Sequence, residues 1–177
     1  MPSCAMDHAG VLSALTHALR PEAGKQPVPK HVLARIAFLI GDAAPRYAEA
    51  NINLDPRDPG GLTGNVAVLT DLAVCAVRLL NVMPVINEPC APGEPGGATV
   101  VDVWPRRNLC GISLNETPDA NINQGWNRAG RLPETSRIKL TYSGGQKLDL
   151  PLDKYADDTK RLEVAALMPS LQADLLA

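Results

Sequence analysis

Apolar and polar residues alternate most regularly in two neighbouring runs, Arg137–Ser143 and Gln146–Leu152, which are separated by Gly144 and Gly145. Alternation is typical of a strand with one buried face, and a glycine pair between two such runs is typical of a tight turn. The pattern therefore predicts an antiparallel β-hairpin in the C-terminal part of the chain.

Further apolar runs upstream are short enough to be strands. They span Arg46–Leu54, Leu62–Leu69, Leu72–Leu80, Thr99–Trp104 and Asn108–Asn115. The run Leu72–Leu80 is also compatible with a helix, since Asp71 could cap its N-terminus. We favour a strand there because a hairpin fits the β pattern on both sides.

Two segments near the N-terminus show helical spacing. His8–Arg20 follows the candidate cap Asp7 and repeats its large aliphatic residues on one face. Lys30–Ile40 follows Pro29, which suits a first helical turn, and its apolar residues cover more than one face. The second helix is therefore expected to pack against neighbours on two sides.

A third helix is predicted over Asp157–Met168. Pro169 interrupts it, and Ser170–Leu176 could continue as a further turn. Three segments lack periodicity and carry turn-forming or polar residues: Asp55–Gly61, Met83–Gly97 and Thr117–Glu134. The last two are long, and loops of that length are often functional.

The chain has 177 residues, of which 45% are apolar and only 3% aromatic. This length supports one domain with an aliphatic core, to which a helical appendage can be added. We expect an α+β protein, with a helical extension at residues 1–44 and a β domain with a C-terminal helix at residues 45–177. The formal net charge of −2 disfavours non-specific nucleic-acid binding, because that mode needs excess lysine and arginine.

No apolar run reaches the roughly 18 residues that a membrane-spanning helix needs. Asp7 and His8 stand where a secretory signal would carry basic residues and then an apolar stretch. The cysteines show no CxxC spacing: Cys4, Cys75, Cys90 and Cys110. We therefore expect a soluble cytoplasmic protein with reduced thiols, and a disulfide through Cys90 is the alternative.

Two segments resemble the pleckstrin-homology superfold, in particular bacterial PH-like domains. Gly64–Asp71 resembles the glycine, apolar strand and Leu-Thr-Asp segment of such domains, and Arg137–Leu152 resembles their last hairpin before the helix. The resemblance covers Arg46 to Leu176. It implies a bent antiparallel sheet that forms an open β-barrel, closed by a C-terminal helix, and a function in binding.

Lipid-binding members of that superfold place several basic residues in the loop between their first two strands. Here Arg57 stands alone beside Asp55 and Asp58, which argues against a phosphate site at this loop. Because one fold serves many functions, the resemblance does not choose among partners.

The sequence contains none of the common motifs for acyl transfer, phosphate binding, dinucleotide binding or zinc-dependent hydrolysis. Cys4 and His8 stand four residues apart and could form half a metal site, but no second pair completes it. We expect no catalytic residue, no cofactor and no metal. An enzyme of unfamiliar type that uses Cys110 or Asp102 is an alternative, and it would require a deep pocket.

Basic residues and both tryptophans gather in the β region, and arginine and tryptophan are enriched at binding hot spots. The candidate binding surface consists of Trp104, Arg106, Arg107, Trp126, Arg128, Arg131, Arg137, Lys139 and Lys147. Within it, Arg137, Lys139 and Lys147 are expected to share one solvent face of the hairpin. A solvated sheet face without a partner is the alternative interpretation.

The leading hypothesis is a non-enzymatic protein-interaction or regulatory module. Its partner would be an acidic protein that meets the basic surface or a sheet edge, or a second copy held through the amphipathic helix at Val11–Leu19. The second hypothesis is a peripheral domain that binds anionic lipid headgroups, and nucleic acid ranks last. The composition is typical of a GC-rich genome and suggests a bacterial or phage protein, such as an accessory or defence factor of a prophage or mobile element.

Overall fold

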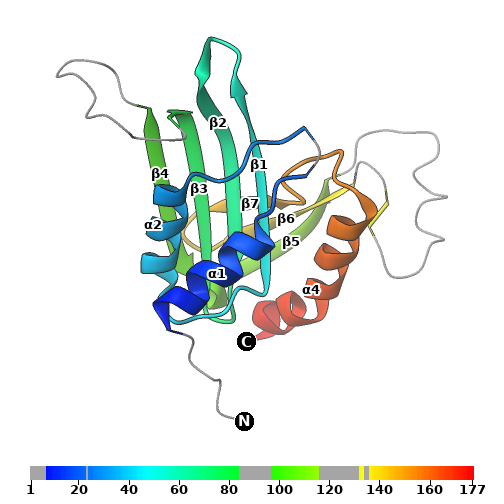
Figure 1. The fold of residues 1–177 in the computed structure, drawn as a ribbon. Helices are drawn as coiled ribbons and strands as arrows, with labels where there is room; N and C mark the ends of the chain where they lie inside the picture. The colour runs from blue at the N-terminus through cyan, green and yellow to red at the C-terminus, as the bar shows by residue number, and fades with distance from the viewer. Residues whose placement is uncertain (1–6, 23, 84–96, 116–131, 134–135) are drawn as a thin grey trace. The chain divides into compact units, whose positions relative to one another are not determined.

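The computed structural model describes residues 7–22, 24–83, 97–115, 132–133 and 136–177 (Figure 1). Its elements follow in the order α1 His8–Ala18, α2 Lys30–Ile40, β1 Tyr47–Asp55, β2 Asp58–Leu69, β3 Ala73–Val82, β4 Ala98–Pro105, the 3₁₀ turn η1 Arg106–Asn108, β5 Leu109–Asn115, β6 Arg137–Tyr142, β7 Lys147–Leu150 and α4 Asp158–Leu176. This confirms the predicted α+β class, with two N-terminal helices and a C-terminal helix. The described strands form two antiparallel sheets, in the orders β1-β2-β3-β4 and β5-β6-β7, and they close no barrel.

The chain divides into two compact units, Met1–Trp104 and Pro105–Ala177. The boundary that the sequence predicted at residue 45 falls inside the first unit. The physical reason is that α1 and α2 share a core with the four-stranded sheet and form no separate appendage.

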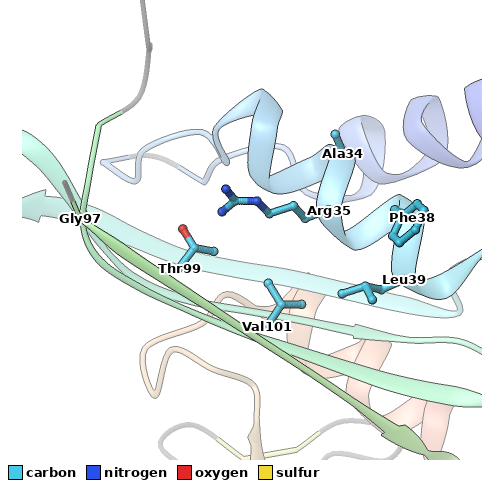
Figure 2. A pocket seen from close by; sticks show the side chains of 7 residues that line it. All are labelled: Ala34, Arg35, Phe38, Leu39, Gly97, Thr99 and Val101. Atoms are coloured by element: carbon cyan, nitrogen blue, oxygen red, sulfur yellow. The ribbon is translucent and has the colours of Figure 1, made fainter. Parts of the chain in front are cut away.

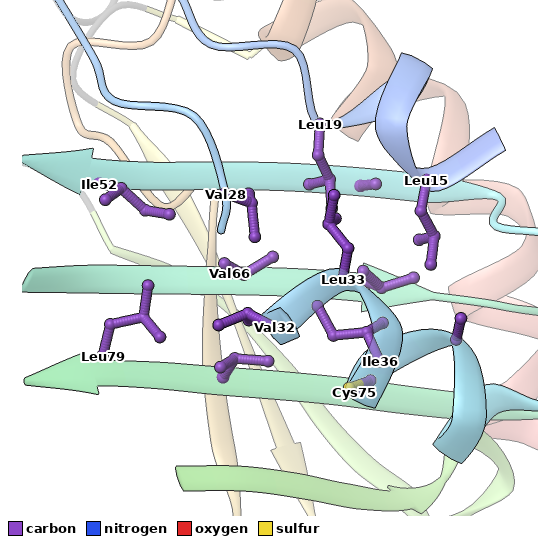
Figure 3. Packing of buried hydrophobic residues seen from close by; sticks show 14 of the residues in the cluster. Leu15, Leu19, Val28, Val32, Leu33, Ile36, Ile52, Val66, Cys75 and Leu79 are labelled. Atoms are coloured by element: carbon purple, nitrogen blue, oxygen red, sulfur yellow. The ribbon is translucent and has the colours of Figure 1, made fainter. Parts of the chain in front are cut away.

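In the first unit, α1 and α2 cover one face of the four-stranded sheet (Figures 1 and 3). The Asp7 carboxylate caps α1 by accepting from the Gly10 N–H at 2.7 Å. The shared core is aliphatic apart from one thiol, and it includes Val11, Leu15, Val32, Ile36, Ile52, Val66, Val68, Cys75, Val77 and Leu79.

The segment Leu72–Leu80 forms a strand, as we predicted over the helical alternative. β3 pairs with β2 in the register Val66↔Val77 and Val68↔Cys75. Asp71 caps no helix here. It forms a bidentate ion pair with Arg46, at 2.7 and 2.8 Å, beside the turn between β2 and β3.

In the second unit, the predicted C-terminal hairpin is present as β6 and β7, with Leu140 opposite Leu148. Ile138, Leu140 and Tyr142 are buried at alternate positions. The expectation that Pro169 interrupts the last helix is wrong, because α4 continues from Asp158 to Leu176. Leu167 and Leu171 are buried on both sides of the proline, and this packing holds the helix together across the missing N–H.

No helix among the described residues is long and apolar enough to cross a membrane.

Candidate functional site

Three residues of the predicted binding surface lie on one face of the second sheet, as the alternation indicated. Arg137 and Lys139 stand at alternate positions of β6, and Lys147 lies opposite Thr141 on β7. Asp149 lies directly opposite Lys139 and is 3.8 Å from Arg137. Arg137 also donates to the carbonyl of Pro151 at 2.8 Å. The face is therefore partly neutralised, and Arg137 has a structural role.

Arg106 does not belong to an accessible surface, contrary to the sequence-based interpretation. It is 3% exposed and donates to Asp174 at 2.5 Å and to Ser170 at 2.6 Å, both on α4. The adjacent Arg107 is exposed. Trp104 is buried at the end of β4 in the first unit. Trp126, Arg128 and Arg131 lie outside the described residues.

A different feature stands out in the first unit, between α2 and β4. A groove of about 650 Å³ is lined by Ala34, Arg35, Phe38, Leu39, Gly97, Thr99 and Val101 (Figure 2). Its floor is β4, the last strand of the sheet, and its wall is the outward side of α2. Gly97 has no room for a side chain, since a Cβ there would lie 1.8 Å from the Asn81 carbonyl oxygen.

The two edges of this sheet differ. At β1 the linker between the helices covers the edge, because the Gln26 N–H donates to the Ile52 carbonyl at 2.9 Å and Lys25 donates to the Asn51 side chain at 2.8 Å. At β4, among the described residues, only β3 bonds to the backbone of Ala98–Val103. Within the described part of the first unit, the outer edge of β4 therefore has no backbone partner and has the geometry to accept a further strand.

As expected, α2 packs against two neighbours, α1 and the four-stranded sheet. One side is buried on the sheet, but Phe38 is 80% exposed and Leu39 is 45% exposed. Both line the groove beside β4 (Figure 2). None of the groove residues was predicted as a site from the sequence, although the surplus of apolar residues in Lys30–Ile40 was the signal that could have indicated the groove.

The described residues contain no group of three or more histidine, cysteine, aspartate or glutamate side chains that could hold a metal ion.

Burial, with a smaller contribution from the charge of Asp102, raises the pKa of the Cys75 thiol to about 12, which makes it a poor nucleophile. The exposed Cys110 thiol donates to the Thr141 carbonyl at 3.3 Å. The groove itself is lined by apolar residues, one threonine and Arg35, a composition that suits binding.

Comparison with family models, with curated proteins and with solved structures gives no match. The resemblance to PH-like domains stays a prediction, and the function has to be argued from the groove and the sheet edge.

Proposed function

We propose that this chain is a non-enzymatic protein-interaction module, and that its first unit binds an extended segment of a partner protein as a strand added to β4. The observation that carries the proposal is that, among the residues the structure describes, the outer edge of β4 has no backbone partner and lies beside a groove lined mainly by apolar residues. In strand addition, main-chain hydrogen bonds provide affinity and pockets for alternate side chains provide specificity.

The composition of β4 supports this role. The strand is rich in β-branched residues, with Thr99, Val100, Val101 and Val103, and Asp102 is its one charged residue. Val100 and Val103 are exposed. An exposed apolar edge strand readily pairs with another chain, and native proteins usually protect such edges. The described residues protect the edge at β1 and not the edge at β4, so β4 is the edge that suits a partner.

The helix above the groove supports it as well. An aromatic side chain as exposed as Phe38 costs little conformational entropy to immobilise and provides a large contact area, which is typical of binding hot spots. A peptide strand on β4 would place alternate side chains beneath Phe38 and Leu39. Binding would then cover the side of α2 that the fold of the first unit leaves exposed.

The proposal is tested by selecting random dodecapeptides displayed on phage against the immobilised full-length chain. Selected peptides are synthesised and their affinity is measured by fluorescence anisotropy. We expect Phe38→Ala to weaken binding by about tenfold or more, the usual cost of truncating an aromatic hot spot. Leu72→Ala is the matched control, because Leu72 is 76% exposed in the same unit and lies away from the groove.

Two outcomes would overturn the proposal. One is that selected peptides bind Phe38→Ala as tightly as the unsubstituted chain. The other is that the chain is a dimer by light scattering, that Phe38→Ala makes it monomeric, and that no peptide competes with dimerisation. In that case a second copy occupies the edge.

A further inference from the structure

We propose that the groove selects peptides that carry a carboxylate and an apolar side chain two residues apart, with the carboxylate on Arg35 and the apolar group between Phe38 and Val101. The inference rests on the proposed strand addition and adds to it the chemistry of the partner segment.

The groove has a polar end and an apolar end (Figure 2). At one end the Arg35 guanidinium extends from α2 toward Thr99 and Gly97, and the Thr99 hydroxyl points to the same side. At the other end Phe38 and Leu39 lie above Val101. The two ends therefore favour different side chains.

Arg35 provides the cation at the polar end. Among the described residues no carboxylate forms an ion pair with it and no acceptor takes a hydrogen bond from it, whereas Arg46, Arg106 and Arg137 all have acidic partners. A guanidinium beside apolar surface forms charge-assisted, bidentate hydrogen bonds with a carboxylate that are stronger than neutral ones. A carboxylate on the partner is the group that complements it.

The spacing follows from the register of a sheet. Thr99 and Val101 are two positions apart on β4 and both line the groove, so their side chains lie on the same face. Residues directly opposite them on an added strand are also two apart and have Cβ atoms about 4.5–5.5 Å from theirs. The partner segment therefore has the sequence pattern acidic-x-apolar if it runs in one direction along β4, and apolar-x-acidic if it runs in the opposite direction.

A second copy of β4 lacks this pattern. In an antiparallel pairing about a twofold axis, the residues that face the groove of one copy are Thr99, Val101 and Val103 of the other. None of the three carries a carboxylate, and Asp102 points to the opposite face. Self-pairing would leave both copies of Arg35 without an anion, which favours a different protein as the partner.

The probes are capped nonapeptides of threonine with a lysine at each end, in which glutamate and valine lie two positions apart in either order. Matched peptides replace glutamate with glutamine. Because Arg35 is exposed in the free chain, we expect one glutamate peptide to bind about two- to fivefold more tightly than its glutamine match, as an ion pair at a solvent-exposed site provides. Arg35→Gln should reduce this ratio to about one. Arg78→Gln, at an exposed arginine of β3 outside the groove, should keep the ratio.

The outcomes separate the inference from the proposed function. Equal affinities for glutamate and glutamine peptides, with binding that still depends on Phe38, would overturn the carboxylate selection and leave strand addition in place. A preference for glutamate that Arg35→Gln does not change would place the anion on another residue and also overturn it. Absence of binding by all four peptides and by the phage-selected peptides would overturn both.

Discussion

Arg106 and Asp174 form an ion pair at 2.5 Å that joins the start of the second unit to the end of α4, 68 residues later. We expect Arg106→Ala to lower the free energy of unfolding by about 2–3 kcal/mol, because the change removes a buried cation and its hydrogen bonds. Urea denaturation followed by circular dichroism measures the loss. Arg107→Ala, at the exposed neighbour, should stay within about 0.5 kcal/mol. Equal effects of the two substitutions would contradict this role of Arg106.

Gly64 occupies a position on β2 that other residues cannot take. Its φ is +153°, and a Cβ would lie 2.1 Å from the Asn51 carbonyl oxygen on the neighbouring strand. Gly64→Ala should therefore destabilise the first unit by about 2 kcal/mol or more. Gly60→Ala on the same strand is the control, since its nearest neighbour is the flexible Met83 side chain at 3.5 Å. A thermal unfolding experiment in which both variants lose the same stability would refute the steric argument.

Burial, together with the charge of Arg35, lowers the pKa of His31 below 6.5. The unfolded chain then takes up the proton at a higher pH than the folded one. The contribution of His31 to stability is therefore complete above pH 6.5 and is lost as the pH falls through the lowered pKa. His31→Gln should reduce the loss of stability on acidification, measured by urea denaturation across this range. His17→Gln is the control for replacing a histidine in a helix. The prediction would be contradicted if the stability of His31→Gln and that of the unsubstituted chain depended on pH in the same way.

The two described cysteines should differ in reactivity. Cys75 is buried with its pKa raised to about 12, whereas Cys110 is exposed. Iodoacetamide at mildly alkaline pH should modify Cys110 in the native chain and modify Cys75 only after unfolding in urea, because the thiolate is the nucleophile. Peptide mapping by mass spectrometry distinguishes the two sites. Rapid native modification of Cys75 would show that the core of the first unit opens.

Local patterns predicted much of the fold. The C-terminal hairpin was predictable because Gly144 and Gly145 separate two alternating runs, and both N-terminal helices were predictable from their spacing and caps. The predicted interruption of the last helix at Pro169 was wrong because a rule based on local sequence does not include the tertiary packing of Leu171. The charge pattern could not separate Arg106 from Arg107, since burial depends on the distant Asp174.

The candidate site was harder to predict than the fold. The groove combines Arg35 and Phe38 on α2 with Thr99 and Val101 on β4, and only the folded sheet brings these segments together. The excess apolar face of α2 was visible in the sequence. Whether that face is buried or exposed is decided by what packs on it, and a pattern within one helix does not contain that information.

Amide hydrogen exchange of the isotope-labelled chain, followed by NMR with and without a selected peptide, tests strand addition most directly. We predict that alternate amides of Ala98–Val103, those that point away from β3, exchange at least about tenfold more slowly when the peptide is bound. The amides at the covered edge of β1 should not change. Unchanged exchange along β4 at saturating peptide, or new protection confined to β5–β7, would contradict the account.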